Sequence, residues 1–302
     1  MTPASAKCSL PEVVQKIGRL ELRARSIVEG FLSGAHRSPY FGQSVEFREH
    51  RPYVVGDDLR YVDWKVWGKQ DRLVVKRFEE DTNLRCTLLV DVSASMSYGR
   101  GPLNKHAYAA TAAAAIAYLI LRQHDAVGCI AFDDTIRRQV PMRTKRGQLS
   151  AITEAVSQPP TVAKTDIAAV LRSVASSVPR RGVVVLISDL LGDVAAMLPS
   201  LQMLLKNGHD LIVLHVLDDE ELDFPFEGPT RFEGLESIDH LQCDPRALRR
   251  GYMESLNSYL ADLSRVCRNH GIDYSLTRTS TPFNEVLARL LAHRRLTQRS
   301  QR

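Results

Sequence analysis

The sequence predicts an α/β protein built on a doubly wound, mostly parallel sheet. From residue 84 onward, short continuous apolar segments alternate with longer segments of helical periodicity. Continuous apolar strands are typical of parallel sheets, because the crossover helices cover both faces of the sheet. With 44% hydrophobic and 25% charged residues, a chain of 302 residues can bury a core that needs no disulfides.

The expected elements of this sheet domain follow one another in regular alternation. The strands are expected at residues 86–91, 127–132, about 136–140, 183–188, 210–217 and 272–277, and the helices at about 104–122, 147–156, 166–177, 194–206 and 245–270. Residues 107–121 are mostly alanine and too short to span a bilayer, so they predict a buried helix packed on the sheet. Residues 218–245 are expected to form a loop or hairpin, and the run DDEE at 218–221 a solvated loop.

The ends of the chain extend this domain. Apolar residues at helical spacing predict a helix over residues 11–32, and residues 73–78 are expected to form a strand. In the long helix that begins at 245, the same spacing predicts a buried stripe that includes Leu248 and Leu263. We divide the chain into an N-terminal helix and segment packed on the sheet domain (1–83), the sheet domain with its insertion (84–280), and a C-terminal helix with a basic tail (281–302).

Charge and cysteine content indicate the compartment and disfavour some partners. The net charge of +5 comes from five arginines in residues 289–302; the rest of the chain balances 35 basic against 35 acidic residues. A basic tail alone is weak evidence for nucleic acid, so we regard a nucleic-acid partner as unlikely. Five scattered cysteines, no signal-peptide core and no membrane span predict a cytoplasmic protein.

The first strand of the sheet domain ends in a chemically distinctive motif. Asp91 closes the strand, and Ser93 and Ser95 follow at alternate positions. In an extended segment, residues of one parity point the same way, so both hydroxyls are expected beside the Asp91 carboxylate. This oxygen set without His or Cys suits a hard cation, although Asp and Ser are also ordinary cap and turn residues.

Two further oxygen ligands are expected from loops at the same edge of the sheet. Asp189 follows the most apolar strand, and Thr165 precedes a helix. Ligands of doubly wound sheets bind beyond the carboxyl ends of the strands, where the strand order reverses. Each residue alone is compatible with a cap or a turn, but their joint order predicts a metal site.

This set resembles the metal-ion-dependent adhesion site of von Willebrand factor A domains, which have a Rossmann-like fold. In that family two serines, a threonine and two aspartates hold the metal directly or through water, and one position stays open for an acidic residue of a partner. The resemblance implies a metal shell of Asp91, Ser93, Ser95, Thr165 and Asp189 around Mg²⁺, or another divalent cation such as Mn²⁺ or Ca²⁺. Ala163-Lys164 replaces the usual glycine-rich approach to the threonine.

Residues 42–83 resemble the signature of a bacterial family called domain of unknown function fifty-eight. The matching residues are Glu46-Phe47, Arg51, Tyr53, Gly56, Asp57, Asp58, Arg60, Asp63, Trp64, Lys76, Phe78 and Glu79. Gly68-Lys69 stands where the family usually has Ala-Arg. The dense Arg/Asp pairs with aromatics predict either a half-buried ion-pair network or a partner-binding surface.

The resemblance implies a non-catalytic protein-binding module. Proteins of this family are typically encoded beside MoxR-type AAA+ ATPases, so the implied partner is such an ATPase, its client protein, or both. The implied role is chaperone-like maturation of, or metal insertion into, the client.

The sequence lacks the common enzymatic motifs. Ser93 replaces the second aspartate of a dehalogenase-type phosphatase, and neither a nucleophile elbow nor a P-loop is present. We therefore expect no enzyme. The alternative is a Mg²⁺-dependent hydrolase or phosphotransferase, because Mg²⁺ can activate water.

Overall fold

The structure is a computed structural model of the whole chain. It describes residues 10–34, 49–54, 62–77, 84–99, 103–145, 147–160, 166–179, 181–228, 230–233, 235 and 240–300. The chain divides into two units, Met1–Ala35 with Leu84–Arg302, and His36–Asn83.

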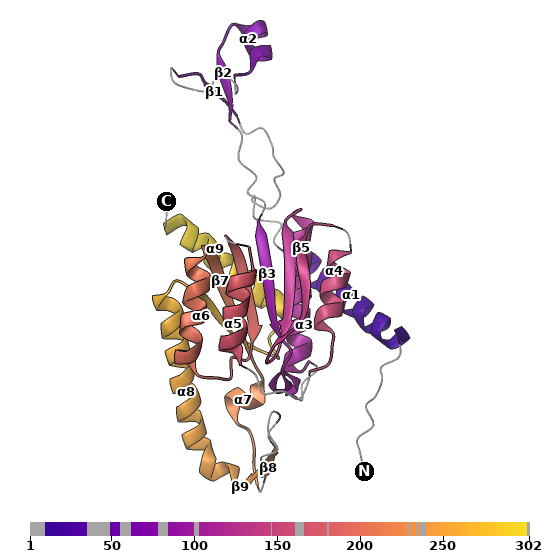
Figure 1. Ribbon diagram of the computed structural model, residues 1–302, viewed down its shortest axis with the longest axis vertical. Coiled ribbons are helices and arrows are strands. Elements are labelled where there is room, and N and C mark those ends of the chain that lie inside the picture. The colour runs from indigo at the N-terminus through magenta and orange to yellow at the C-terminus, as the bar shows by residue number, and fades with distance from the viewer. Residues whose placement is uncertain are drawn as a thin grey trace. The chain divides into compact units, whose positions relative to one another are not determined.

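The larger unit is built on a six-stranded sheet with the strand order β10-β7-β6-β3-β4-β5 (Figure 1). Its strands are β3 (Arg85–Asp91), β4 (Ala126–Phe132), β5 (Ile136–Arg143), β6 (Gly182–Ser188), β7 (His209–Leu217) and β10 (Asp273–Arg278). Neighbouring strands are parallel, except that the edge strand β5 runs antiparallel to β4. The predicted mostly parallel α/β sheet is confirmed.

The strand order reverses direction between β3 and β6. From β3 the chain moves outward through β4 to β5, then returns with β6 to the other side of β3 and moves outward through β7 to β10. The two strands at the reversal lie side by side in parallel, with Val90 opposite Ile187. Their carboxyl ends therefore meet at the topological switch point, where open α/β sheets bind ligands.

Helices cover both faces of the sheet, as its continuous apolar strands predict. The bounds of the covering helices are α1 (Leu10–Gly34), α3 (Lys105–Arg122), α4 (Gln148–Val156), α5 (Ile167–Ser177), α6 (Val194–Lys206), α8 (Pro245–Asn269) and α9 (Phe283–Ser300). Residues of α1, α3, α4 and α9 share one apolar core with Leu88 and Val90. Residues of α5, α6 and α8 share the other core with Leu89, which points to the opposite face.

The alanine-rich helix α3 lies at the centre of the first core. Its alanines from Ala112 to Ala115 are completely buried, and small side chains let the helix approach the sheet and α1 closely. Asn104 caps its first turn by accepting from the amide of Ala107 at 2.8 Å. The expectation of a buried helix at 107–121 is confirmed.

The insertion after β7 is more ordered than its sequence indicates. It contains the short helix α7 (Asp219–Asp223) and a hairpin of β8 (Thr230–Glu233) and β9 (His240–Cys243). The prediction that DDEE forms a solvated loop is wrong, because Asp218 is 3% exposed and starts α7 with a capping box to Glu221. The predicted buried stripe of α8 is also partly wrong, since Leu248 is exposed.

The smaller unit contains an antiparallel pair, β1 (Glu49–Pro52) with β2 (Val74–Arg77), and the helix α2 (Trp64–Gln70). Asp63 caps α2 by accepting from the amides of Lys65 and Val66. Trp64 and Trp67 pack edge to face, and both are about half exposed, at 54% and 44%. The predicted packing of this segment on the sheet domain stays a prediction.

Two further expectations concern the chain as a whole. Among the helices that the structure describes, none is both long and apolar enough to cross a membrane. Cys86, Cys129 and Cys267 are buried free thiols, as the cysteine spacing predicts.

Candidate functional site

The two aspartates singled out in the sequence lie at the switch point of the sheet. Asp91 is the last residue of β3, and Asp189 directly follows β6. Both are buried, with exposed fractions of 0% and 1%. Because β3 and β6 are parallel neighbours, the sheet itself brings these carboxylates together at one edge.

Asp91 is held by hydrogen bonds from Ser93 and Ser188. Its Oδ1 accepts from the backbone amide of Ser93 at 2.9 Å, and its Oδ2 accepts from the hydroxyl of Ser188 at 2.6 Å. The Ser188 oxygen in turn accepts from the amide of Leu190 at 2.9 Å.

The electrostatic environment of Asp91 is unfavourable for its charge. Burial, joined by the negative charge of Asp189, raises the pKa of Asp91 to about 7, against the hydrogen bonds from Ser188 and Ser93 that lower it. Two buried carboxylates that repel each other are stabilised by a cation placed between them.

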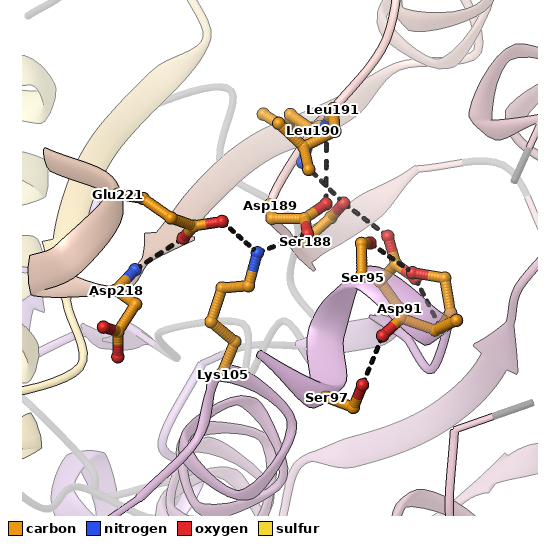
Figure 2. A network of polar contacts seen from close by, with 12 residues as sticks. Asp91, Ser95, Ser97, Lys105, Ser188, Asp189, Leu190, Leu191, Asp218 and Glu221 are labelled. Carbon is orange, nitrogen blue, oxygen red and sulfur yellow. Dashed lines mark hydrogen bonds and ion pairs between the residues drawn. The ribbon is translucent and has the colours of Figure 1, made fainter. Parts of the chain in front are cut away.

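Ser93 and Ser95 complete the oxygen cluster, by a different local geometry from the one expected. Residues Ala94–Ser97 form a 3₁₀ turn, so the extended alternation that we predicted for 93 and 95 is absent. The turn nevertheless brings the two buried hydroxyls together, with 3.0 Å between Ser93 Oγ and Ser95 Oγ. Figure 2 shows Ser95 beside Asp91.

A buried lysine that the sequence motifs did not indicate contacts Asp189. Lys105, the first residue of α3, is 0% exposed, and its Nζ lies 2.8 Å from Asp189 Oδ2 and 2.7 Å from Glu221 Oε1. Burial lowers the pKa of Lys105, but Asp189 and Glu221 outweigh this effect and the net pKa is raised. The lysine is therefore an internal cation of the site.

Glu221 is itself fixed by the start of α7. Its Oε2 accepts from the amide of Asp218 at 2.8 Å, and its backbone oxygen accepts from the hydroxyl of Tyr252 on α8 at 2.8 Å. Asp218 Oδ2 accepts from the hydroxyl of Thr279 at 2.7 Å. The insertion is thus tied by successive contacts to Lys105 and Asp189, as Figure 2 shows.

Both ring nitrogens of His215, beside this cluster, have hydrogen-bond partners. The two ring nitrogens of His215 lie 2.8 Å from the backbone oxygen of Asp189 and 2.8 Å from the hydroxyl of Tyr274. Burial lowers the pKa of His215 to about 4, so the ring is neutral near pH 7. It orients the backbone at Asp189 and has no nitrogen left to act as a base.

Several residues of the predicted sites fall outside the described residues. Thr165 does so, and the structure therefore brings together four of the five predicted ligands. Of the signature, Glu46, Asp57, Asp58 and Arg60 also lie outside, and Arg51 is described in its backbone alone. Asp63 and Trp64 lie at the start of α2, and Tyr53 follows β1.

The sequence carried only weak signals for the residues that were missed. Ser188 precedes Asp189 at the end of an apolar strand, where a hydroxyl is unusual enough to indicate a role. Lys105 is the charged residue at the head of an alanine-rich helix, a position that ordinarily points to solvent. Glu221 stands three residues after Asp218, the spacing of a capping box.

The donor set fits a hard cation. Within the described ranges, no group of three or more His, Cys, Asp or Glu side chains is placed to hold a metal ion. The oxygens of Asp91, Ser93, Ser95 and Asp189 are of the kind that bind Mg²⁺, Mn²⁺ or Ca²⁺. A cation here would offset the repulsion between the two carboxylates.

Comparison with protein families identifies the chain's relatives. A family model described as "Protein of unknown function DUF58" matches residues 49–259, more than half of the chain. The chain belongs to the DUF58 family. The match begins in the signature segment and includes Asp91, Asp189, Lys105 and Glu221.

Curated relatives cover nearly the same length. The uncharacterized proteins Rv1480 of Mycobacterium tuberculosis and Mb1516 of Mycobacterium bovis are each 29% identical over 290 residues, which covers 94% of this chain and 90% of theirs. The DUF58 match and the alignments with these relatives include residues of both units.

Solved structures have lower sequence identity to this chain than the curated relatives do. The protein BatB from Bacteroides thetaiotaomicron has a TM-score of 0.46 and 15% identity, over 70% of this chain and 98% of that one. An aerotolerance-related membrane protein from Bacteroides fragilis has a TM-score of 0.46 and 16% identity, over 70% and 99%.

Proposed function

We propose that this DUF58 protein is a non-catalytic binding module that contacts its partner through a divalent cation, as adhesion-type von Willebrand factor A domains do. Asp91, Ser93, Ser95 and Asp189 would hold the cation, together with Thr165 if that residue acts as in the resembling family. The cation, Mg²⁺ in this proposal, supplies a positive centre that accepts a carboxylate oxygen from an acidic residue of the partner.

One observation carries this proposal: two buried carboxylates and two hydroxyls meet at the switch point. Asp91 and Asp189 come from adjacent parallel strands, and the hydroxyl oxygens of Ser93 and Ser95 are 3.0 Å apart. Adjacent ligands of an octahedral Mg²⁺ at about 2.1 Å are separated by about 3.0 Å. The two hydroxyls hydrogen-bond each other across this distance, and a cation would replace that bond with a lone pair from each oxygen.

The charges of the site favour an anionic partner group. Two carboxylates roughly neutralise a divalent cation, and the hydroxyls add no charge. The ammonium of Lys105, 2.8 Å from Asp189 Oδ2, offsets part of the negative charge of that carboxylate. The cation therefore keeps affinity for one more carboxylate, which a site of three or four free carboxylates would repel.

The partner follows from the family resemblance. We propose a MoxR-type AAA+ ATPase, or the client of that ATPase, with a role in chaperone-like maturation or metal insertion. The exposed side chain of Leu191, at 52%, lies two residues beyond Asp189 and offers an apolar contact beside the metal. An acidic residue with an apolar neighbour is the partner surface that suits this arrangement.

The arrangement of titratable groups argues against hydrolysis as the primary activity. Metal-assisted hydrolysis needs a group that removes or delivers a proton at the attacking water. His215 uses both ring nitrogens, and Lys105 is held between two carboxylates. Turnover of generic phosphoesters by the purified protein would instead favour the hydrolase alternative.

A capture experiment tests the proposal. The full-length protein and the variants Asp91→Asn and Asp262→Asn are used as baits in native lysate, each with Mg²⁺ and with EDTA. Asp262→Asn is the control, because Asp262 is a half-exposed aspartate that pairs with Arg265 on α8. The proposal predicts an ATPase retained by wild type and Asp262→Asn in Mg²⁺ only, whereas equal retention by all baits in EDTA contradicts it.

A further inference from the structure

The contact between Lys105 and Asp189 restricts how that aspartate can bind a cation. In Figure 2, Lys105 and Glu221 lie on one side of Asp189, and Asp91 and Ser95 lie on the other. Asp189 Oδ2 faces the ammonium at 2.8 Å, which leaves Oδ1 as the oxygen with only a long contact of 3.4 Å, from the amide of Leu191. Because the ammonium carries a full positive charge beside Oδ2, it repels a cation that approaches this oxygen, so Asp189 offers a cation Oδ1 rather than both oxygens.

The lysine is held firmly in this position. Its ammonium is fixed by Glu221 at 2.7 Å and lies 5.9 Å from the ring centre of Tyr98. Its backbone amide donates to the backbone oxygen of Tyr98 at 3.0 Å. Because Lys105 is fully buried and carries two ion pairs, moving its head group away from Asp189 would leave charges uncompensated in the interior.

Divalent cations differ in what they require of a carboxylate. Ca²⁺ takes about six to eight oxygens at about 2.3–2.6 Å and commonly uses both oxygens of one carboxylate, whereas Mg²⁺ takes six at about 2.0–2.1 Å. A carboxylate restricted to a single oxygen therefore suits Mg²⁺ better than Ca²⁺.

We propose that Lys105 is a specificity-determining residue of the metal site. By holding Oδ2 of Asp189 it limits that carboxylate to a single oxygen, and so it favours six-coordinate Mg²⁺ over Ca²⁺. Glu221 is the positioning residue that holds the ammonium in place. This inference rests on the proposed metal-binding function and adds to it the choice of ion.

The variants that test this role must keep the interior charge balanced. Lys105→Met alone leaves Asp189 and Glu221 both without their cation, so the informative variant is the double substitution Lys105→Met with Glu221→Gln. The matched control is Glu221→Gln alone, which keeps the contact between Lys105 and Asp189. Circular dichroism and thermal melting in the presence of each ion first establish that each variant is folded.

The measurement is the dissociation constant of each full-length protein for Mg²⁺ and for Ca²⁺ by calorimetric titration. The ratio of the Ca²⁺ constant to the Mg²⁺ constant is expected to fall about tenfold to 100-fold in the double variant, the range for substitutions that orient a metal ligand. Glu221→Gln weakens the hold on the ammonium but keeps Lys105, so it is expected to lower that ratio by less than the double variant does.

The possible results separate this inference from the proposed function. If the double variant binds metal with the wild-type ratio, Lys105 does not select the ion, and the metal site itself stands. If wild type binds neither Mg²⁺ nor Ca²⁺ at millimolar concentrations, the proposed function fails and this inference fails with it.

Discussion

The hydroxyl of Ser188 donates a hydrogen bond of 2.6 Å to Oδ2 of Asp91 and joins the ends of two neighbouring strands. The last residue of β6 thereby orients the last residue of β3. The same oxygen of Ser188 accepts from the amide of Leu190, which has a left-handed backbone with a φ of 50°. One serine therefore fixes both the carboxylate and the turn that carries Asp189.

Replacing this serine with alanine is expected to destabilise the protein. Ser188→Ala leaves an oxygen of Asp91 and the amide of Leu190 buried without this partner, and each such loss costs about 1–3 kcal/mol. Denaturant unfolding without metal should show a loss of about 2–6 kcal/mol in the free energy of unfolding. Ser176→Ala, on the outer face of α5, should stay within about 0.5 kcal/mol of wild type.

A loss below about 0.5 kcal/mol in Ser188→Ala would show that Asp91 is oriented by other groups. It would also remove the reason for treating Ser188 as part of the site.

The pH dependence of stability should report the raised pKa of Asp91. Burial and the charge of Asp189 raise this pKa to about 7 from 3.8, so the metal-free folded state holds the proton more tightly than the unfolded state does. The proton bound to Asp91 stabilises the folded state fully below about pH 4, and this contribution is lost as the pH rises towards 7. Asp91→Asn has no such proton to lose.

The measurement is the difference in unfolding free energy between Asp91→Asn and wild type in EDTA, from about pH 4.5 to about pH 8. The difference removes the contribution of other groups, such as His215, whose lowered pKa acts in the opposite direction. Relative to wild type, Asp91→Asn should become more stable as the pH rises, and this difference in unfolding free energy should level off above about pH 7. A difference that does not vary with pH would mean that the pKa of Asp91 is not raised in the folded state.

Gly99 is expected to tolerate no side chain. Its φ is 128°, and a Cβ built there would lie 2.7 Å from Asp218 Oδ2 and 3.0 Å from the Cα of Asn104. Asp218 cannot easily move, because Thr279 and the amide of Glu220 hold its two oxygens. Gly99→Ala should therefore cost about 1–3 kcal/mol of unfolding free energy, measured with denaturant.

The control for this substitution is Gly18→Ala. Gly18 lies within α1 and has no atom within 4 Å of its built Cβ, so alanine there should raise stability by about 0.5–1 kcal/mol. If Gly99→Ala is as stable as wild type, Asp218 at the start of α7 does not pack against Gly99.

Asp63 offers a test of the signature segment. As the N-cap of α2 it accepts from the amides of Lys65 and Val66, and its loss in Asp63→Ala should cost about 1 kcal/mol of local stability. Hydrogen exchange of those two amides should become about five to ten times faster. Unchanged exchange would mean that Asp63 is not needed to cap the helix.

The sheet could be predicted because each of its strands and helices is specified by the residues within that element. Each strand is a continuous apolar run, and each helix follows at regular spacing, so β3 and β6 could be placed from the sequence alone. Pairing Asp91 with Asp189 required one more step, the rule that parallel strands present their carboxyl ends at one edge.

The contacts of Lys105 were not predictable for the opposite reason. They join residues 84 and 116 positions apart, and the sequence around Lys105 shows only the first turn of an ordinary helix. The order of the 218–221 segment depends on the same long-range contacts. From the sequence alone, four adjacent acidic residues indicate a solvated loop. The structure differs because the buried ammonium of Lys105 pairs with one of them, Glu221.

The 3₁₀ turn after Asp91 shows how a correct residue set can rest on a wrong local geometry. Alternation in an extended chain predicted that the hydroxyls of Ser93 and Ser95 would converge. They converge because residues Ala94–Ser97 turn, which places the two oxygens 3.0 Å apart. Small residues at these positions permit both conformations, so spacing alone did not distinguish them.

Metal binding itself is the central claim, and Mn²⁺ tests it most directly, because electron paramagnetic resonance detects the free ion quantitatively. Full-length wild type and the double variant Ser93→Ala with Ser95→Ala are titrated with Mn²⁺. We expect one tightly bound ion per wild-type chain, competed by Mg²⁺, and an affinity at least about tenfold weaker in the variant. Absence of binding by wild type, or equal binding by both proteins, would contradict the claim.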